Sequence, residues 1–176
     1  VWSLAVTSGN RLYALTPIGL SYFDLRSSSE NPVLKRGPQS TAGELFTYFP
    51  NISFGTGSRI KLDTHENAWT TSPSDGIHVL LANATYWPDD DPNLSVEGIT
   101  TETSHILSNE VTDVAFDNEQ GLAYITTKQG LNAFRIPFST PKKIYTSFKV
   151  FPSPFHVPSQ KPLIIDGLID KSSLMV

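Results

Sequence analysis

The acidic run Asp89, Asp90 and Asp91 is the densest group of potentially reactive side chains in the sequence. Its carboxylate oxygens are of the kind that bind calcium. Calcium loops, however, space their carboxylates alternately and add a glycine and a bidentate glutamate, and this pattern is lacking here. We therefore interpret the run as a solvated loop and keep its three residues only as weak candidates for ligand binding.

The other titratable and nucleophilic residues do not have the spacing of a catalytic or metal site. The four histidines stand singly, without the spacing of a zinc site: His65, His78, His105 and His156. The chain has no cysteine, which excludes disulfides, thiolate metal sites and cysteine nucleophiles. It also has no Gly-x-Ser-x-Gly elbow, and Gly55-Thr-Gly-Ser58 is not followed by the helix that a phosphate loop needs. We predict no catalytic residue, no metal and no cofactor.

Aromatic residues in predicted loops are better candidates for recognition, because loops on a rigid scaffold carry many binding residues. Tyr86 and Trp87 directly precede the acidic run, and Trp2 lies near the start of the chain. We expect all three to be exposed, and we take Tyr86 and Trp87 as further weak ligand-binding candidates.

The clearest structural unit is the stretch from Leu107 to Phe134. Runs rich in Val, Ile, Thr, Tyr and Phe, which are typical of strands, alternate there with turns that end at Gly121 and Gly130. Glycine suits such turns because it adopts positive φ without steric penalty. The stretch therefore predicts a small antiparallel meander.

The same unit recurs twice upstream at a nearly fixed period. The aromatic residue of the middle strand is Tyr13, Trp69 or Tyr124, so the copies are 56 and 55 residues apart (69 − 13 and 124 − 69). These aromatics could form a sugar-stacking row, but repetition at one position favours buried packing. Further repeat positions are turn glycines and turn-initiating aspartates: Gly19, Gly76, Gly130, Asp63 and Asp117. We interpret the aspartates as Asx-turn residues rather than as an acid and base pair.

Composition supports an all-β globular chain. The 176 residues are 39% apolar and 17% charged, and 13 prolines and 11 glycines separate short β-like runs. The formal charge of −4 and the absence of a Lys/Arg cluster argue against a nucleic-acid partner. No apolar run approaches the ~20 residues of a membrane span.

The repeat predicts a partial β-propeller of about three four-stranded antiparallel blades, because such units stack around an axis. We expect the blades at 1–138, with a short edge strand at Pro32–Lys35 and an aromatic strand at Leu45–Phe54. A linker is expected at 139–147, and the start of an immunoglobulin-like β-sandwich at 148–176. Both ends look cut from a longer protein.

The third copy resembles the two-component-regulator type of propeller repeat. The residues that carry this resemblance are Leu107-Ser-Asn-Glu-Val111, Asp117, Gly121, Tyr124, Thr127 and Gly130-Leu131. Lys149-Val-Phe-Pro-Ser-Pro-Phe155 with Ile165-Asp-Gly-Leu168 is similar to the start of the immunoglobulin-like C-terminal sorting domains of secreted Bacteroidetes proteins, although Phe151 and Ser153 depart from the usual tyrosine and asparagine. In this order, the two parts resemble propeller proteins of type IX secretion.

The resemblance implies a non-catalytic binding or scaffold propeller located in the periplasm, at the outer-membrane surface or outside the cell. Its partner would be a protein or a glycan such as lipopolysaccharide. One alternative is the extracellular sensor of a hybrid two-component regulator, which carries the same blades. A propeller enzyme acting on polysaccharide is the other, and it would need carboxylates that converge near the axis.

Overall fold

The computed structural model describes residues 1–25, 33–35, 37, 46–88, 98–138, 149–151 and 164–166. This part of the chain contains thirteen strands, and the sheets are antiparallel throughout. The expected acidic loop residues Asp89, Asp90 and Asp91 and the expected linker 139–147 lie outside the described residues. The fold class is all-β, as the sequence predicts.

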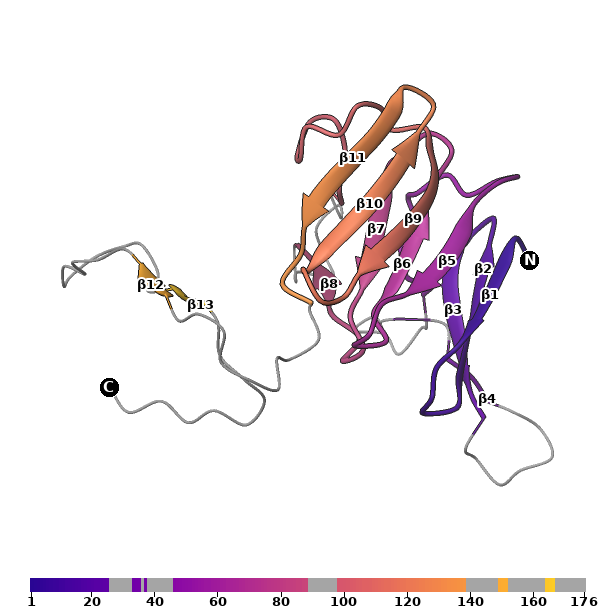
Figure 1. Ribbon diagram of the computed structural model, residues 1–176. Helices are drawn as coiled ribbons and strands as arrows, with labels where there is room; N and C mark the ends of the chain where they lie inside the picture. The colour runs from indigo at the N-terminus through magenta and orange to yellow at the C-terminus, as the bar shows by residue number, and fades with distance from the viewer. Residues whose placement is uncertain are drawn as a thin grey trace, which may run out of the picture.

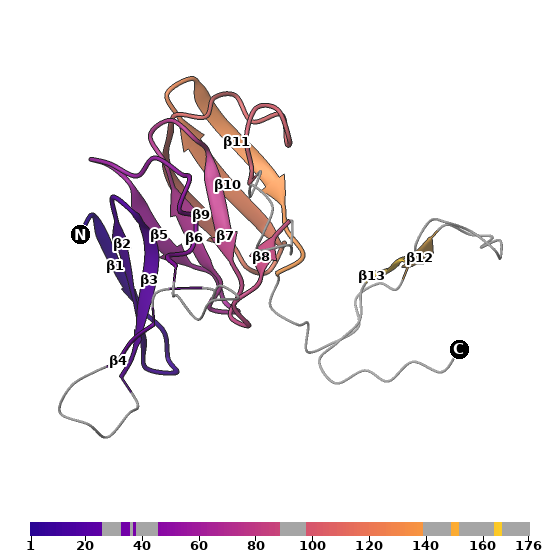
Figure 2. The same ribbon diagram turned by 180° about the vertical axis from the view of Figure 1, so that it is seen from behind.

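Three sheets stand side by side in chain order, as the blades of a partial propeller do (Figures 1 and 2). The first sheet has the order β1-β2-β3-β4, and its strands are Ser3–Val6, Arg11–Thr16, Gly19–Asp24 and Val33–Lys35. The second has the order β5-β6-β7-β8, and its strands are Arg59–Leu62, Ala68–Thr71, Ile77–Leu80 and Tyr86–Trp87. The third has the order β11-β10-β9, with strands Val111–Asp117 (β9), Leu122–Thr127 (β10) and Gly130–Arg135 (β11). Each of the first two blades therefore has the expected four strands, and the third has three among the described residues.

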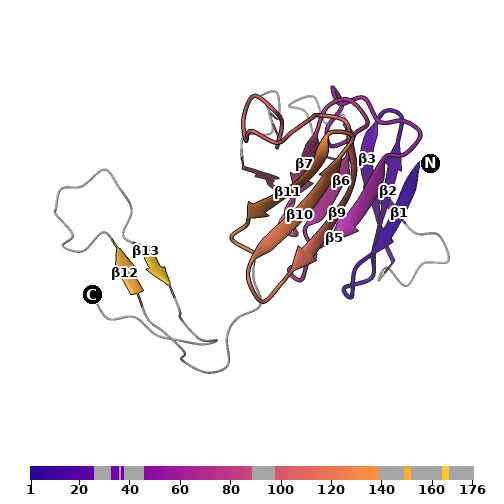
Figure 3. The ribbon, with the colours of Figure 1, turned by 45° about the horizontal axis from the view of Figure 1, so that its top comes forward.

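The first strands of the blades lie next to one another, with β5 between β1 and β9 (Figure 3). The fourth strands of the first two blades lie at the opposite edge of their sheets. This arrangement places β1, β5 and β9 toward the propeller axis. A separate pair, β12 (Lys149–Phe151) and β13 (Ile164–Asp166), falls within the stretch expected to begin the sandwich.

A hydroxyl residue begins the turn between the second and third strands of every blade. In the first blade Thr16 Oγ1 donates to the Gly19 carbonyl at 2.9 Å, and in the third Thr127 Oγ1 donates to the Gly130 carbonyl at 3.2 Å. In the second, Ser72 Oγ accepts the Asp75 main-chain N–H at 3.0 Å. These bonds satisfy polar groups that the turn would otherwise leave unpaired, which explains the Thr/Ser and glycine pattern of the repeat.

The turn glycines Gly19 and Gly76 are required for a further reason. The connection to the next blade runs back beside each turn, where Leu20 pairs with Tyr48 and Ile77 pairs with Ile99. Both glycines have positive φ, and a Cβ there would lie 2.4 Å from the carbonyl oxygen of that connection. Only glycine combines this backbone conformation with such a close approach.

Two hydrophobic clusters fill the spaces between the blades. The cluster between the first and second blades contains Tyr13, and the cluster between the second and third contains Trp69, both with no exposed surface. Neighbouring residues along β6 point to opposite clusters: Ala68 faces the first cluster and Trp69 the second. Strand alternation therefore makes the middle blade a two-sided core element.

The three repeat aromatics occupy corresponding positions in the blades. Each lies three residues before the hydroxyl residue that pairs with the turn glycine: Tyr13 before Thr16, Trp69 before Ser72, and Tyr124 before Thr127. Tyr124 is half-buried, whereas the sequence predicted burial at all three positions. The difference arises because Tyr13 and Trp69 point toward the following blade, while no described sheet packs on that side of the third blade. Leu131, on the same face of this sheet, is 59% exposed.

The aromatic stretch before the second blade is not the expected strand. In its described part, 46–54, only Tyr48 makes a β-bridge, and Phe49 has a positive φ of 58°. Tyr48, Phe49 and Phe54 are instead buried in the cluster between the first two blades. Their hydrophobic side chains fill the inter-blade core from an irregular segment.

Candidate functional site

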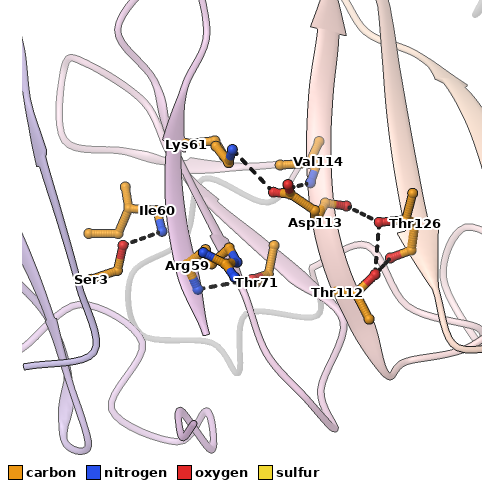
Figure 4. Close-up of polar contacts among 9 residues, drawn as sticks. All are labelled: Ser3, Arg59, Ile60, Lys61, Thr71, Thr112, Asp113, Val114 and Thr126. Atoms are coloured by element: carbon orange, nitrogen blue, oxygen red, sulfur yellow. Dashed lines mark hydrogen bonds and ion pairs between the residues drawn. The ribbon is translucent and has the colours of Figure 1, made fainter. Parts of the chain in front are cut away.

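Polar contacts tie the first strands of the three blades together near the axis (Figure 4). Between β1 and β5, the Ile60 main-chain N–H donates to Ser3 Oγ at 3.1 Å. Between β5 and β9, Lys61 Nζ lies 3.3 Å from Asp113 Oδ1, and both side chains are about half-exposed. Asp113 Oδ1 also accepts the Val114 N–H at 2.9 Å, which fixes the carboxylate. The axial side of the blades therefore presents polar groups to solvent.

Two recesses open beside the Ser72–Gly76 turn, on the face of the blades formed by the turns between second and third strands. The larger has a volume of about 710 Å³ and is bordered by Asp75, His78, Glu102 and Asn109. The smaller, of about 350 Å³, lies toward the first strands and includes Arg59. Both volumes fall within the range typical of ligand pockets, ~300 to 1,000 Å³. This face is the candidate binding site of the described chain.

The carboxylates of the larger recess hold loop segments in place. Asp75 Oδ2 accepts the Ser53 N–H at 2.9 Å and the Ser74 hydroxyl at 3.0 Å. A hydrogen bond from the Thr101 hydroxyl at 2.7 Å lowers the pKa of Glu102 to about 2. Both groups accept hydrogen bonds within the fold, so they shape the recess as fixed acceptors.

His78 is the buried titratable residue of this recess, with only 1% of its surface exposed. Its Nε2 lies 2.8 Å from the Asp75 carbonyl oxygen, so Nε2 carries the proton that the carbonyl accepts. Its Nδ1 has no hydrogen-bond partner among the described residues and faces Gly98, where a Cβ would approach it to 2.5 Å. Burial lowers the pKa of His78, because the charged imidazolium would lose its solvation.

We expect acidification to destabilise the fold through His78. The folded-state pKa is below the ordinary value of about 6.5, so only the unfolded chain takes up this proton as the pH falls below about 6.5. The contribution of His78 to the free energy of unfolding is therefore complete above that pH and decreases below it, by up to about 1.4 kcal/mol per pH unit. Urea unfolding from pH 7.5 to 5 measures this slope. A His78→Gln variant with the same pH dependence as the original protein would contradict the prediction.

The structure corrects one expectation about the aromatic ligand-binding candidates. Tyr86 is only 3% exposed, because it packs into the cluster between the first two blades. Trp87 is half-buried against Trp69, at a ring-centroid distance of 5.6 Å. Both residues form the short strand β8, where the sequence had indicated a loop. Trp2 is 43% exposed, as expected.

The turn aspartates differ in their surroundings although they occupy corresponding turns. Asp63 is buried and accepts hydrogen bonds from the main-chain N–H groups of His65 and Asn67 at 2.8 and 3.1 Å. Asp117 accepts the N–H groups of Glu119 and Gln120 at 3.1 and 3.0 Å. Neither aspartate lies at the recesses described above.

Sequence reasoning missed the residues of the binding face, above all Arg59 and His78, and also the Lys61–Asp113 pair near the axis. The alternation of Arg59 and Lys61 around the buried Ile60 was the available signal for β5. It predicts that these two cations share one side of a strand, but not which blade they face.

The described residues include no cluster of three His, Cys, Asp or Glu side chains that could hold a metal ion. In the same part of the chain, no helix is long and apolar enough to span a membrane.

Comparison with known proteins yields one structural likeness. No protein-family model matches the sequence, and no curated protein matches it. Among solved structures, the chain is similar to PorZ, described as an essential bacterial surface component of the type IX secretion system of Porphyromonas gingivalis. The TM-score is 0.63 with 21% sequence identity, and the match covers 96% of this chain and 22% of PorZ. At this identity the likeness concerns the fold.

Proposed function

We propose that this chain belongs to a non-catalytic binding scaffold that acts outside the cytoplasm in type IX secretion. The observation that carries the proposal is the likeness in fold to PorZ over nearly the whole chain. The propeller and C-terminal sorting-domain motifs of the sequence support the same assignment. The chain spans 22% of PorZ, so the proposal concerns the role of a longer protein to which these blades contribute.

The geometry of the blades supports binding rather than catalysis. Among the carboxylates of the larger recess, Asp75 accepts a hydrogen bond from Ser53 of the segment before the second blade, and Glu102 accepts one from the adjacent Thr101. His78 is buried, and its one ring hydrogen bond goes to a main-chain carbonyl. These groups stabilise a preformed surface, as a recognition scaffold requires. The proposed partner is a protein or a glycan such as lipopolysaccharide at the cell surface.

Truncation of the full-length protein after Pro141 tests the assignment. We expect the truncated protein to lose its surface localisation or its assembly into the secretion complex, because the sorting-type segment is proposed to mediate attachment. Circular dichroism of the purified protein should still show the β-sheet spectrum and cooperative melting of the blades. Cell fractionation and surface protease accessibility measure the localisation.

Normal localisation and secretion by the folded, truncated protein would refute the attachment role. A full-length gene that encodes a membrane helix and a kinase beyond the blades would instead support the sensor alternative.

A further inference from the structure

The smaller recess lies between the second and third blades and is lined by polar and charged residues together with the apolar Pro73 and Val111. Its wall includes Thr56 and Arg59 from the second blade and its entry, and Glu110, Thr112 and Lys128 from the third. Its volume of about 350 Å³ is at the small end of the range for ligand sites. The recess therefore has room for a small molecule or for one residue of a larger one.

The charges around this recess do not balance. Lys61 forms an ion pair with Asp113, and Lys128 forms one with Glu110. Arg59 is exposed and makes no ion pair with any described residue. Of the charged side chains that line the recess, Glu110 and Lys128 compensate each other, and Arg59 leaves one uncompensated positive charge, although the whole chain has a formal charge of −4.

The main chain of Arg59 is held rigidly. Its N–H donates to Thr71 Oγ1 at 3.0 Å, and Arg59 is paired with Thr71 in the ladder between β5 and β6 (Figure 4). The next residue, Ile60, is buried, and its main-chain N–H donates a hydrogen bond to Ser3 Oγ of the first blade. The guanidinium therefore extends from a fixed strand, and its planar fork of donors matches a carboxylate in two parallel hydrogen bonds.

We propose that this recess binds a small organic carboxylate, with Arg59 as the residue that anchors it. A singly charged carboxylate matches Arg59, the one cation at the wall that has no ion pair among the described residues, whereas a phosphate dianion would leave a negative charge uncompensated. The Lys128 ammonium supplies a further donor at the wall. The inference does not depend on a role in secretion, because it rests only on the geometry and charge of the recess.

Ligand-observed NMR with two isosteric probes tests the proposal. Propionate and the neutral propionamide are titrated into the protein at constant ionic strength, and saturation-transfer difference signals are recorded. We expect saturable binding of propionate, with a dissociation constant in the millimolar range, and no saturable binding of propionamide. Arg59→Gln should weaken propionate binding at least tenfold, and Arg59→Lys should weaken it less because lysine keeps the charge without the fork.

The matched control is Arg135→Gln, which removes an exposed arginine of β11 outside the recess. This variant should bind propionate as the unmodified protein does. Circular dichroism melts identify any variant that does not fold. A folded Arg59→Gln variant with unchanged affinity, an equal loss in Arg135→Gln, or equal saturable binding of both probes would each overturn the proposal. Absence of saturable propionate binding would also overturn it.

Discussion

Replacement of Trp69 by alanine is expected to lower the free energy of unfolding by roughly 3 to 5 kcal/mol, as truncation of large core aromatics does. The Trp69 side chain is completely buried between the second and third blades. Its ring lies 5.1 Å from Phe116 and 5.6 Å from Trp87, measured between centroids, and its Nε1 donates to Asp63 at 3.0 Å. Alanine would leave a cavity at the contact between two blades and remove this hydrogen bond.

The control is the same truncation at Trp2, which is 43% exposed. We expect Trp2→Ala to change the free energy of unfolding by about 0.5 kcal/mol or less, as surface substitutions do. Equilibrium denaturation of both variants in urea gives the two values. Similar midpoint shifts for Trp2→Ala and Trp69→Ala would contradict the assigned core.

The repeated strands could be predicted because their residues obey local rules. Tyr13 and Trp69 lie in β-rich runs shortly before the turn glycines Gly19 and Gly76, and the structure places both in the second strand of a blade. The short edge strand β4 lies within the predicted segment 32–35. Turn chemistry and side-chain alternation depend on residues that are close together in the chain, so both can be recognised in a single sequence.

The burial of individual repeat residues could not be predicted in the same way. Tyr124 has the same local surroundings as Trp69, yet it is half-buried because its exposure depends on whether another sheet covers that side. Tyr86 follows a turn-like segment and precedes Pro88, so a loop was the natural interpretation. In the structure, Tyr86 lies in β8, which pairs with β7, and its ring is buried. This burial depends on contacts to residues distant in the chain, such as Phe49, which lies 37 positions earlier.

The binding face and the polar contacts near the axis were equally hidden in the sequence. Lys61 and Asp113 meet only because β5 and β9 come from adjacent blades and lie side by side. His78 carries no motif, and its burial follows from the return of the chain at Gly98 and Ile99 beside Ile77. Sites assembled between repeats depend on how the repeats pack, which the pattern within one repeat does not specify.

Asp63 links the turn between β5 and β6 to the packing between the second and third blades, because it accepts a hydrogen bond from Trp69. Its replacement by alanine should also be strongly destabilising. Its carboxylate is buried and accepts four hydrogen bonds: from the His65 N–H, the Asn67 N–H, Asn67 Nδ2 and Trp69 Nε1. Alanine would remove the acceptor while the Asn67 and Trp69 donors stay buried. Buried donors without partners carry a desolvation penalty, so we expect a loss of about 2 to 4 kcal/mol in the free energy of unfolding.

Asp117 provides the matched control, because it begins the corresponding turn of the third blade. Its carboxylate oxygens accept the main-chain N–H groups of Glu119 and Gln120 and the Gln120 side-chain amide in an exposed turn. Water can replace these bonds, so Asp117→Ala should lose only about 1 kcal/mol. Urea unfolding of the two variants tests the difference. An equal loss at both positions would show that Asp63 acts only as a turn residue, and that its bond to the Trp69 indole contributes nothing measurable to the contact between the blades.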